Sequence, residues 1–243
     1  MPHLFDHTTA AVSLTYDDGM NEHLDAAMPD LEQHGLRGTF YVPTAGDDRP
    51  WTLRRAEWKR AAQRGHEIGN HTHVHPCRHS TFSPDLCDYT HAQIAAEVRE
   101  SDRQLREQIG DGPRSFAYPC GNTTVGRDDA QVSYVDVVQS LYPAARIGSD
   151  TLADPQSVDL YRTPSLVFRE NTSLEAVLEF IDDAIARGQW AVLCFHGVGA
   201  GHFVVKRDMH GAICREVAQR VREKRVYCGT FVDVAERVAA ARG

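Results

Sequence analysis

Short apolar segments alternate regularly with amphipathic stretches along this chain, and that alternation constrains the fold more than any other feature. The segment 11–16 alternates apolar and polar residues, as a strand with one buried face does. The segment 190–195 is apolar almost throughout, as in a strand that is covered on both faces. Between such segments apolar residues recur at helical spacing, as over 24–31. Alternating strands and helices predict a parallel sheet covered by helices.

The strand–helix unit repeats about seven times over residues 1–243, without a linker or a shift in composition. We therefore expect a single α/β domain that closes into a barrel, with an open doubly wound sheet as the alternative. A dinucleotide-binding open sheet is disfavoured, because no G-x-G-x-x-G motif follows the first strand. The predicted strands are 11–16, 39–42, 67–71, 115–118, 145–148, 190–195 and 226–228. The predicted helices are 24–35, 53–64, 90–110, 130–141, 172–188, 209–224 and 232–242, with capping-box patterns at Thr90 and Thr172.

Charge and hydropathy argue against two classes of partner. With 26 Lys and Arg against 34 Asp and Glu, the formal net charge is −8, whereas a protein that binds a phosphate backbone normally carries a basic face. No apolar run approaches the roughly 18 residues of a membrane helix. We therefore expect neither nucleic acid nor membrane as a partner, and the sequence leaves the oligomeric state open.

Compartment and cysteine chemistry are judged from two further features. The first ten residues contain neither the basic segment nor the apolar core of a secretory signal, so we expect a cytoplasmic protein. The six cysteines are scattered without any C-x-x-C pair, so we expect most of them to be reduced and half-buried. Histidine is frequent, at 13 residues, which makes the positions of the imidazoles the next question.

Reactive residues follow the predicted strands where these end. Asp17 and Asp18 follow the first strand, His71 ends the third, Cys120 comes shortly after the fourth, and His196 follows the strand near the C-terminus. In a parallel barrel the carboxyl ends of all strands form one rim, and active sites are built there. We therefore expect these segments to converge on a single site.

The residue types at this rim point to metal-assisted hydrolysis. One carboxylate and two imidazoles are a usual ligand set for a catalytic divalent metal. Asp18, His71 and His75 supply that set, which suits Zn²⁺ first and also Co²⁺, Ni²⁺ or Mn²⁺. Asp17 would act as the general base on water, and His196 would protonate the leaving group of an amide or ester.

Each feature also has a plainer interpretation. Asp-Asp-Gly after a strand is often a turn at a helix N-terminus, where carboxylates favour the positive end of the dipole. A His-x-His-x-His segment also fits an exposed loop, and a histidine before glycine often only hydrogen-bonds at a strand end. The joint placement at strand ends favours a site. His73 stays open, because it shares a side with His71 and His75 on an extended segment but points away in a turn.

These residues resemble the motifs of the polysaccharide deacetylases, carbohydrate esterase family 4. Segment 15–19, T-Y-D-D-G, resembles the first motif, T-F-D-D-G. Segment 66–76 resembles the second motif, with the core H-[ST]-x-x-H. Segment 116–121, F-A-Y-P-C-G, resembles a variant of the third, and 192–196 resembles the last. Segment 38–42 is similar to the second strand of that family.

The resemblance implies a fold and a set of roles. The family fold is a distorted (β/α)7 barrel, which we expect here as one domain over residues 1–243. By motif position Asp18, His71 and His75 would hold Zn²⁺ or a similar divalent ion. Asp17 would be the base and His196 the acid.

The same resemblance assigns the substrate pocket. The backbone N–H of Cys120 would help to hold the oxyanion, with Tyr118 and Pro119 beside it in the same segment. Leu193 would line the pocket for the acetyl methyl group.

The sequence departs from the family pattern at two motifs. The usual third motif, R-P-P-Y-G, has Ala117 here in the arginine position and Cys120 in the tyrosine position. Because the arginine normally orients the base, either another cation does so here, for which Arg162 is a candidate, or the base is tuned differently. The aspartate–tryptophan fourth motif has no clear counterpart, and Asp150 or Asp159 could replace its carboxylate.

The leading hypothesis is a metal-dependent deacetylase for an N- or O-acetylated saccharide or small glycoside. The missing aromatic platform and signal favour a small or intracellular acetylated sugar over a cell-wall polymer. One alternative keeps the barrel but hydrolyses a non-sugar amide, cyclic imide or ureide. Another is a catalytically silent protein that binds carbohydrate or metal.

Overall fold

A curled parallel sheet forms the centre of the computed structural model, which describes residues 4–243; residues 1–3 of the predicted domain lie outside the described part. The strand order is β8-β9-β1-β2-β3-β4-β7, and β10 also pairs with β1. All of these pairings are parallel, as the strand–helix alternation predicts. The strands are β1 (Ala11–Tyr16), β2 (Thr39–Val42), β3 (Glu67–Asn70), β4 (Phe116–Ala117), β7 (Ala145–Arg146), β8 (Leu166–Val167), β9 (Trp190–Phe195) and β10 (Tyr227–Cys228).

The two ends of this strand order approach each other. A parallel bridge joins Arg146 of β7 to Thr163, which lies just before β8. Ile147 N–H donates to the Thr163 carbonyl at 2.9 Å, and Ser149 N–H donates to the Ser165 carbonyl at 3.2 Å. The sheet therefore curls into a distorted barrel, and the predicted fold class is confirmed over the open-sheet alternative.

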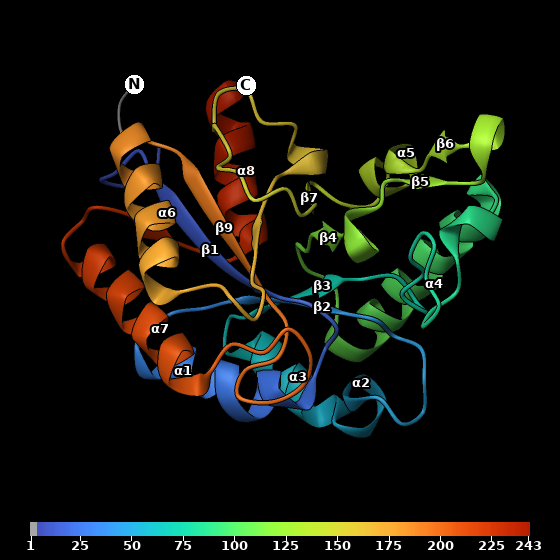
Figure 1. Cartoon of the computed structure of the whole chain (residues 1–243), viewed down its shortest axis with the longest axis horizontal. Helices are drawn as coiled ribbons and strands as arrows, with labels where there is room; N and C mark the ends of the chain where they lie inside the picture. The colour runs from blue at the N-terminus through green and yellow to red at the C-terminus, as the bar shows by residue number, and fades with distance from the viewer. Residues whose placement is uncertain (1–3) are drawn as a thin grey trace.

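Helices cover the outside of the curled sheet (Figure 1). In this view α1, α6 and α7 lie on the left, α4 and α5 on the right, and both termini at the top. A short hairpin of β5 (Thr124–Val125) and β6 (Val132–Ser133) lies beside α5. The helices are η1 (His23–Ala27), α1 (Met28–Gln33), α2 (Pro50–Leu53), α3 (Arg55–Gln63), α4 (His91–Ile109), α5 (Val135–Gln139), α6 (Leu174–Arg187), α7 (Arg207–Arg222) and α8 (Phe231–Arg242), with one-turn 3₁₀ segments η2 (Leu86–Asp88), η3 (Pro119–Gly121), η4 (Asp128–Ala130) and η5 (Leu160–Arg162).

Local signals predict the long elements well and the short ones poorly. The capping box at Thr90 and Gln93 is confirmed. The predicted cap at Thr172 is wrong by one residue, because the Ser173 side chain accepts the Ala176 N–H at the start of α6. The helix predicted over 130–141 shrinks to α5, and β5, β6 and β8 were not predicted. Strands of two residues are too short to carry a periodic pattern.

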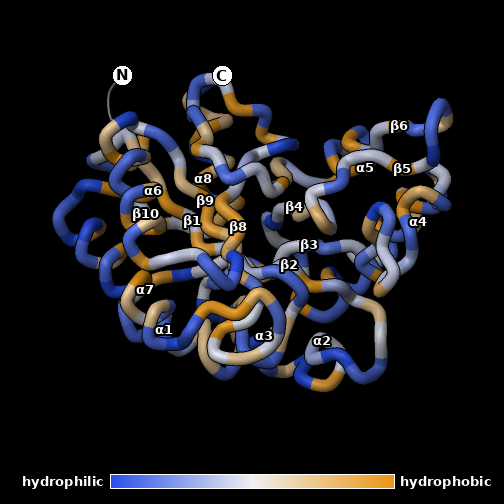
Figure 2. The backbone as a smooth tube through the Cα atoms, viewed as in Figure 1, coloured by the Kyte–Doolittle hydropathy of each residue, from blue (hydrophilic) through white to orange (hydrophobic). Residues whose placement is uncertain are grey.

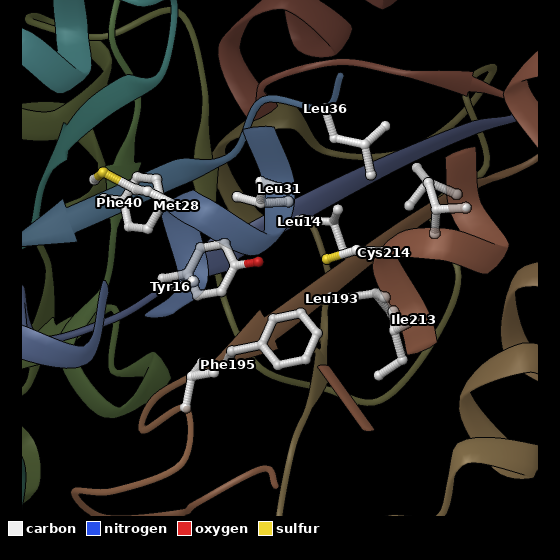
Figure 3. Close-up of a cluster of buried hydrophobic side chains, with 14 of the residues drawn as sticks. Leu14, Tyr16, Met28, Leu31, Leu36, Phe40, Leu193, Phe195, Ile213 and Cys214 are labelled. Carbon is white, nitrogen blue, oxygen red and sulfur yellow. The ribbon is translucent and has the colours of Figure 1, made fainter. Parts of the chain in front are cut away.

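The main apolar core lies between the sheet and the helices α1, α6 and α7. Figure 2 shows apolar residues along β1 and β9, with mostly hydrophilic residues on the outer parts of the chain. Figure 3 shows Leu14 and Tyr16 of β1 beside Leu193 and Phe195 of β9 in this core. Successive side chains of a strand point to opposite faces. The residues at the alternate positions of β1 and β9 therefore face the inside of the curl. There the Ser13 hydroxyl accepts a hydrogen bond from the indole N–H of Trp190.

No helix within residues 4–243 is both long enough and apolar enough to cross a bilayer.

Candidate active site

The reactive residues at the strand ends line one cavity of about 430 Å³ at the carboxyl rim of the sheet. Asp17 and Asp18 follow β1, His71 follows β3, and His196 follows β9. Parallel pairing of β9, β1, β2 and β3 brings these strand ends side by side, although the residues are far apart in the sequence. The predicted convergence of these residues is therefore observed.

Asp18, His71 and His75 form a cluster whose ligand atoms lie within 4.8 Å of one another. Asp18 Oδ1 is 3.2 Å from His75 Nε2 and 3.7 Å from His71 Nε2. The His71 ring nitrogen Nδ1 lies 2.8 Å from the Ala117 carbonyl. Because a carbonyl only accepts, Nδ1 carries the hydrogen and Nε2 keeps its lone pair toward the cluster. A divalent metal could bind this set with positions left open for water and substrate.

A tight turn after β3 brings the two histidines together. Thr72 and His75 both have positive φ values, 64° and 59°, in the left-handed region that non-glycine residues seldom adopt. The Thr72 hydroxyl accepts the His75 N–H at 3.1 Å and closes the turn. His73 points away from the cluster, and its Nδ1 hydrogen-bonds the Thr44 hydroxyl at 2.9 Å. The open question about His73 is thus answered by the turn.

Asp17 is buried beside this cluster and forms an ion pair with Arg146. The Arg146 guanidinium donates to both carboxylate oxygens, and the Cys194 thiol lies 3.5 Å from Oδ2. Burial alone would raise the pKa of Asp17, but the Arg146 cation outweighs it and holds that pKa at about 2. Asp17 is therefore ionised at neutral pH, as a general base must be.

The prediction that Arg162 orients Asp17 is wrong, because Arg146 is the cation that pairs with Asp17. Arg162 lies on η5 and pairs with Asp159 at 2.8 Å, where both side chains are substantially exposed. Arg146 instead comes from β7, where it is the direct ladder partner of Ala117. Side chains of paired residues in adjacent strands share a face, so the guanidinium reaches the place that Ala117 leaves empty. A lone arginine in the predicted strand 145–148 was the available signal.

Leu193 does not line the cavity, contrary to the expectation for the acetyl pocket. Its side chain packs in the outer core with Leu14 and Ile213 (Figure 3). Cys194 occupies the cavity wall instead. Only residues two apart on a strand share a face, so Cys194 rather than Leu193 lies on the same side as His196. The alternation could have given this result from the sequence.

The third-motif segment contains a disulfide. Cys120 bonds to Cys77, so these two depart from the expected reduced state, while Cys87, Cys194, Cys214 and Cys228 are free as expected for most of the cysteines. Cys120 also has a positive φ of 53° and lines the cavity, as does Tyr118. Pro119 is the buried residue of this one-turn segment.

His196 lines the same cavity as the third-motif turn, and its backbone is held by a hydrogen bond. Its carbonyl accepts from His23 Nε2 at 2.9 Å, and His23 Nδ1 accepts the Met20 N–H at 3.2 Å. The pKa of His196 is lowered by burial. Its Nδ1 is buried and has no hydrogen-bond partner among residues 4–243.

The cavity mouth adds residues that the sequence did not single out. His202 and Phe203 come from the loop after β9, and the Phe203 ring centroid lies 5.2 Å from that of His196. On the opposite rim Asp150 forms an ion pair with Arg169 at 2.8 Å. Of the two carboxylates considered for the fourth motif, Asp150 is therefore the one in the cavity wall. No sequence pattern identifies a loop residue such as His202.

Comparison with known proteins identifies the family to which this fold and this site belong. The family model for polysaccharide deacetylases matches residues 6–134, so the chain belongs to that family. It is 32% identical over 165 residues to a gellan lyase from Bacillus sp., a match that covers 68% of this chain and 6% of that protein. It is 34% identical over 98 residues to a chitooligosaccharide deacetylase of Sinorhizobium fredii, covering 40% of each.

The fold has close counterparts among solved structures. The Xyl-CE4 domain of a multidomain xylanase, from the hindgut metagenome of Trinervitermes trinervoides, superposes with a TM-score of 0.60 at 12% identity, over 95% of this chain and 91% of that domain. The chain thus spans nearly the whole of that domain, but less than half the length of both curated relatives described above.

Proposed function

We propose that this protein is a metal-dependent deacetylase acting on an N- or O-acetylated saccharide. The observation that carries the proposal is the ionised pair of Asp17 and Arg146 beside the Asp18, His71 and His75 cluster, in one cavity with His196. If the ion pair of Asp17 and Arg146 served only to stabilise the fold, there would be no need for imidazole nitrogens without hydrogen-bond partners beside it. Family membership supports the same chemistry.

Asp18, His71 and His75 would hold the divalent ion, with Zn²⁺ the first candidate and Co²⁺, Ni²⁺ or Mn²⁺ compatible with the same donors. Such an ion polarises the acyl oxygen and lowers the pKa of water, which favours hydrolysis at neutral pH. The hydrogen bond from His71 to the Ala117 carbonyl supports this assignment, because metal-binding histidines usually donate their second N–H in this way.

The residues of the chain would divide the proton transfers between them. Asp17 takes a proton from the attacking water, and Arg146 keeps the carboxylate ionised and oriented. His196, held in place by His23, would then give a proton to the leaving nitrogen or oxygen from its protonated form. Cys120 lines the cavity in a left-handed turn, and its backbone N–H would hold the developing oxyanion.

The cavity fits a sugar better than a flat imide. Its volume of about 430 Å³ is in the range of small-molecule sites and suits a short saccharide. Phe203 is 52% exposed at the mouth and offers an apolar ring to one face of a pyranose. The ion pair of Asp150 and Arg169 provides donors and acceptors for hydroxyl groups.

Substituting the two aspartates separately tests the proposal. In Asp17→Asn the base is lost but the metal donors remain, so acetate release should fall by about 10²–10⁴-fold with metal content unchanged. In Asp18→Asn both metal content and acetate release should fall. The measurements are elemental analysis and acetate release from acetylated chito-oligosaccharides.

Three outcomes would contradict the proposal. Undiminished acetate release by Asp17→Asn would remove the base assignment. Turnover of cyclic imides or ureides, with none of any acetylated sugar by the same metal-loaded preparation, would establish the alternative substrate class. Binding of metal or sugar without turnover of any acyl substrate would indicate a catalytically silent protein.

A further inference from the structure

The loop that follows β9, residues 197–205, folds back over the cavity. Val205 N–H donates to the Gly197 carbonyl, and Gly197 N–H donates to the His202 carbonyl, both at 2.9 Å. A Cβ atom on Gly201 would lie 2.1 Å from Met20 Cε, so the loop backbone packs on the side chain of Met20, two residues after Asp18. The loop is therefore tied to the same turn that carries the two aspartates.

His202 bonds to the oxygen of Asp18 that faces away from the other two histidines. His202 Nε2 lies 2.7 Å from Asp18 Oδ2, whereas Oδ1 is the atom near His71 and His75. An ionised carboxylate only accepts hydrogen bonds, so His202 Nε2 is the donor. The two oxygens of Asp18 are thus distinguished, one held by the loop and the other left toward the cluster.

A purely structural role for this contact is a poor explanation. The His202 side chain is 55% exposed, so it buries little surface, while the Asp18 side chain is only 15% exposed. Asp18 also has a positive φ of 77°, an uncommon conformation for a residue with a side chain. Such conformations persist where the surroundings hold them, and the loop provides one of the contacts that do so.

We propose that His202 is a positioning residue that fixes the carboxylate of Asp18 with Oδ1 toward the metal. This inference rests on the proposed metal site. Residues that hydrogen-bond to a metal ligand orient it, and the loss of such a residue typically weakens metal binding by about 10–100-fold. His202 also lies near Asp18 and His196 as a third donor, so direct ligation is the competing arrangement. Its contact with Oδ2 rather than Oδ1 favours positioning.

The test compares His202→Ala and His202→Gln with the wild-type chain. Competition with a chelator gives the affinity for Zn²⁺, and X-ray absorption of the Zn²⁺ form counts the imidazole ligands. His202→Ala should weaken Zn²⁺ binding by about 10–100-fold, and His202→Gln, which keeps an N–H donor, should recover most of it. Both variants and the wild type should show two imidazoles on the metal.

His91→Ala is the matched control, because His91 is also partly exposed and also pairs with an aspartate, Asp136, away from the cavity. Equal Zn²⁺ affinity in wild type, His202→Ala and His202→Gln would overturn the positioning role and leave the proposed function intact. Three imidazoles in the wild type and two in His202→Ala would overturn it in favour of direct ligation. A wild-type chain that binds no divalent metal would instead reject the metal-dependent function itself.

Discussion

At the scale of single residues, a departure from the family pattern is compensated by the neighbouring strand. Ala117 stands where the third motif usually has arginine, and Arg146 is its ladder partner on β7. The Arg146 guanidinium is buried. Its Nη1 lies 3.1 Å from Ser165 Oγ, and its Cζ lies 5.1 Å from the centroid of the Tyr41 ring. The cation that pairs with Asp17 therefore comes from the adjacent strand, opposite the position of the family's arginine.

Exchanging these two positions tests that explanation. Arg146→Ala leaves the buried carboxylate of Asp17 unpaired, which should cost about 3–5 kcal/mol of stability. Arg146 holds the pKa of Asp17 at about 2, below its unfolded value, so the pair stabilises the fold above pH 3.8 and loses that effect as pH falls toward 2. Without the cation, burial raises this pKa and the acid limb of the pH–rate profile should move to higher pH.

Adding Ala117→Arg to Arg146→Ala should restore part of both the stability and the pH profile, since residues 117 and 146 are Cα partners. Urea unfolding and pH–rate measurements on the wild type and both variants check this. No recovery in the double variant would show that position 117 cannot replace position 146.

A second buried side chain makes stability depend on pH far from the cavity. His66 Nδ1 accepts the Gly38 N–H at 3.1 Å, and Nε2 lies 3.1 Å from Glu32. Burial lowers the pKa of His66 from 6.5 to about 4, so the folded state binds fewer protons than the unfolded state between these values. The stability it contributes is complete above pH 6.5 and is lost as pH falls toward 4.

The variant His66→Gln should flatten this dependence while keeping a donor and an acceptor. Between pH 7.5 and pH 4 the wild type should lose on the order of 3 kcal/mol more stability than the variant, at about 1.4 kcal/mol per pKa unit. Urea unfolding at a series of pH values measures the difference. Equal slopes in the two proteins would contradict the assignment.

At the scale of elements, the turns after β3 and β4 are joined covalently. The Cys77–Cys120 disulfide ties the segment after His75 to the turn that lines the cavity at Cys120. Reducing compartments rarely keep such bonds. The cytoplasmic location expected from the first residues stays a prediction, and this disulfide argues against it.

Removing this bond should affect both stability and turnover. The double variant Cys77→Ser with Cys120→Ser should lose about 2–4 kcal/mol, because the bond closes a segment with a sequence separation of 43. Turnover should fall as well, since the turn at Cys120, which is proposed to hold the oxyanion, loses its covalent tie, and dithiothreitol should reproduce both losses in the wild type. Cys228→Ser, at a free cysteine, is the control. If dithiothreitol under unfolding conditions changed neither the stability nor the turnover of the wild type, the proposed role of the Cys77–Cys120 disulfide would be contradicted.

At the scale of the whole molecule, barrel closure assembles the site. The bridge between Arg146 and Thr163 joins the two edges of the sheet, and β7 is thereby turned inward toward β1. Without that closure Arg146 and Asp17, which are 129 residues apart, would lie at distant strands of an open sheet. The curl also brings residues at or just after the ends of β1, β3, β4, β7, β8 and β9 to one cavity, as the parallel alternation favours.

The sequence by itself determined the parallel α/β class, the long strands β1 and β9, and the arrival of Asp17, Asp18, His71 and His196 at one rim. These follow from local periodicity and from the rule that parallel strands end at the same edge. Only the tertiary structure decided that Arg146 replaces Arg162, that Cys77 bonds to Cys120, and that His202 reaches Asp18 across 184 positions. The physical reason is that such pairings depend on how far the sheet curls and how loops return, and neither is encoded in a short-range pattern. The misplacement of Leu193 did not need the tertiary structure to correct it, because strand alternation already predicts Cys194 rather than Leu193 in the cavity wall.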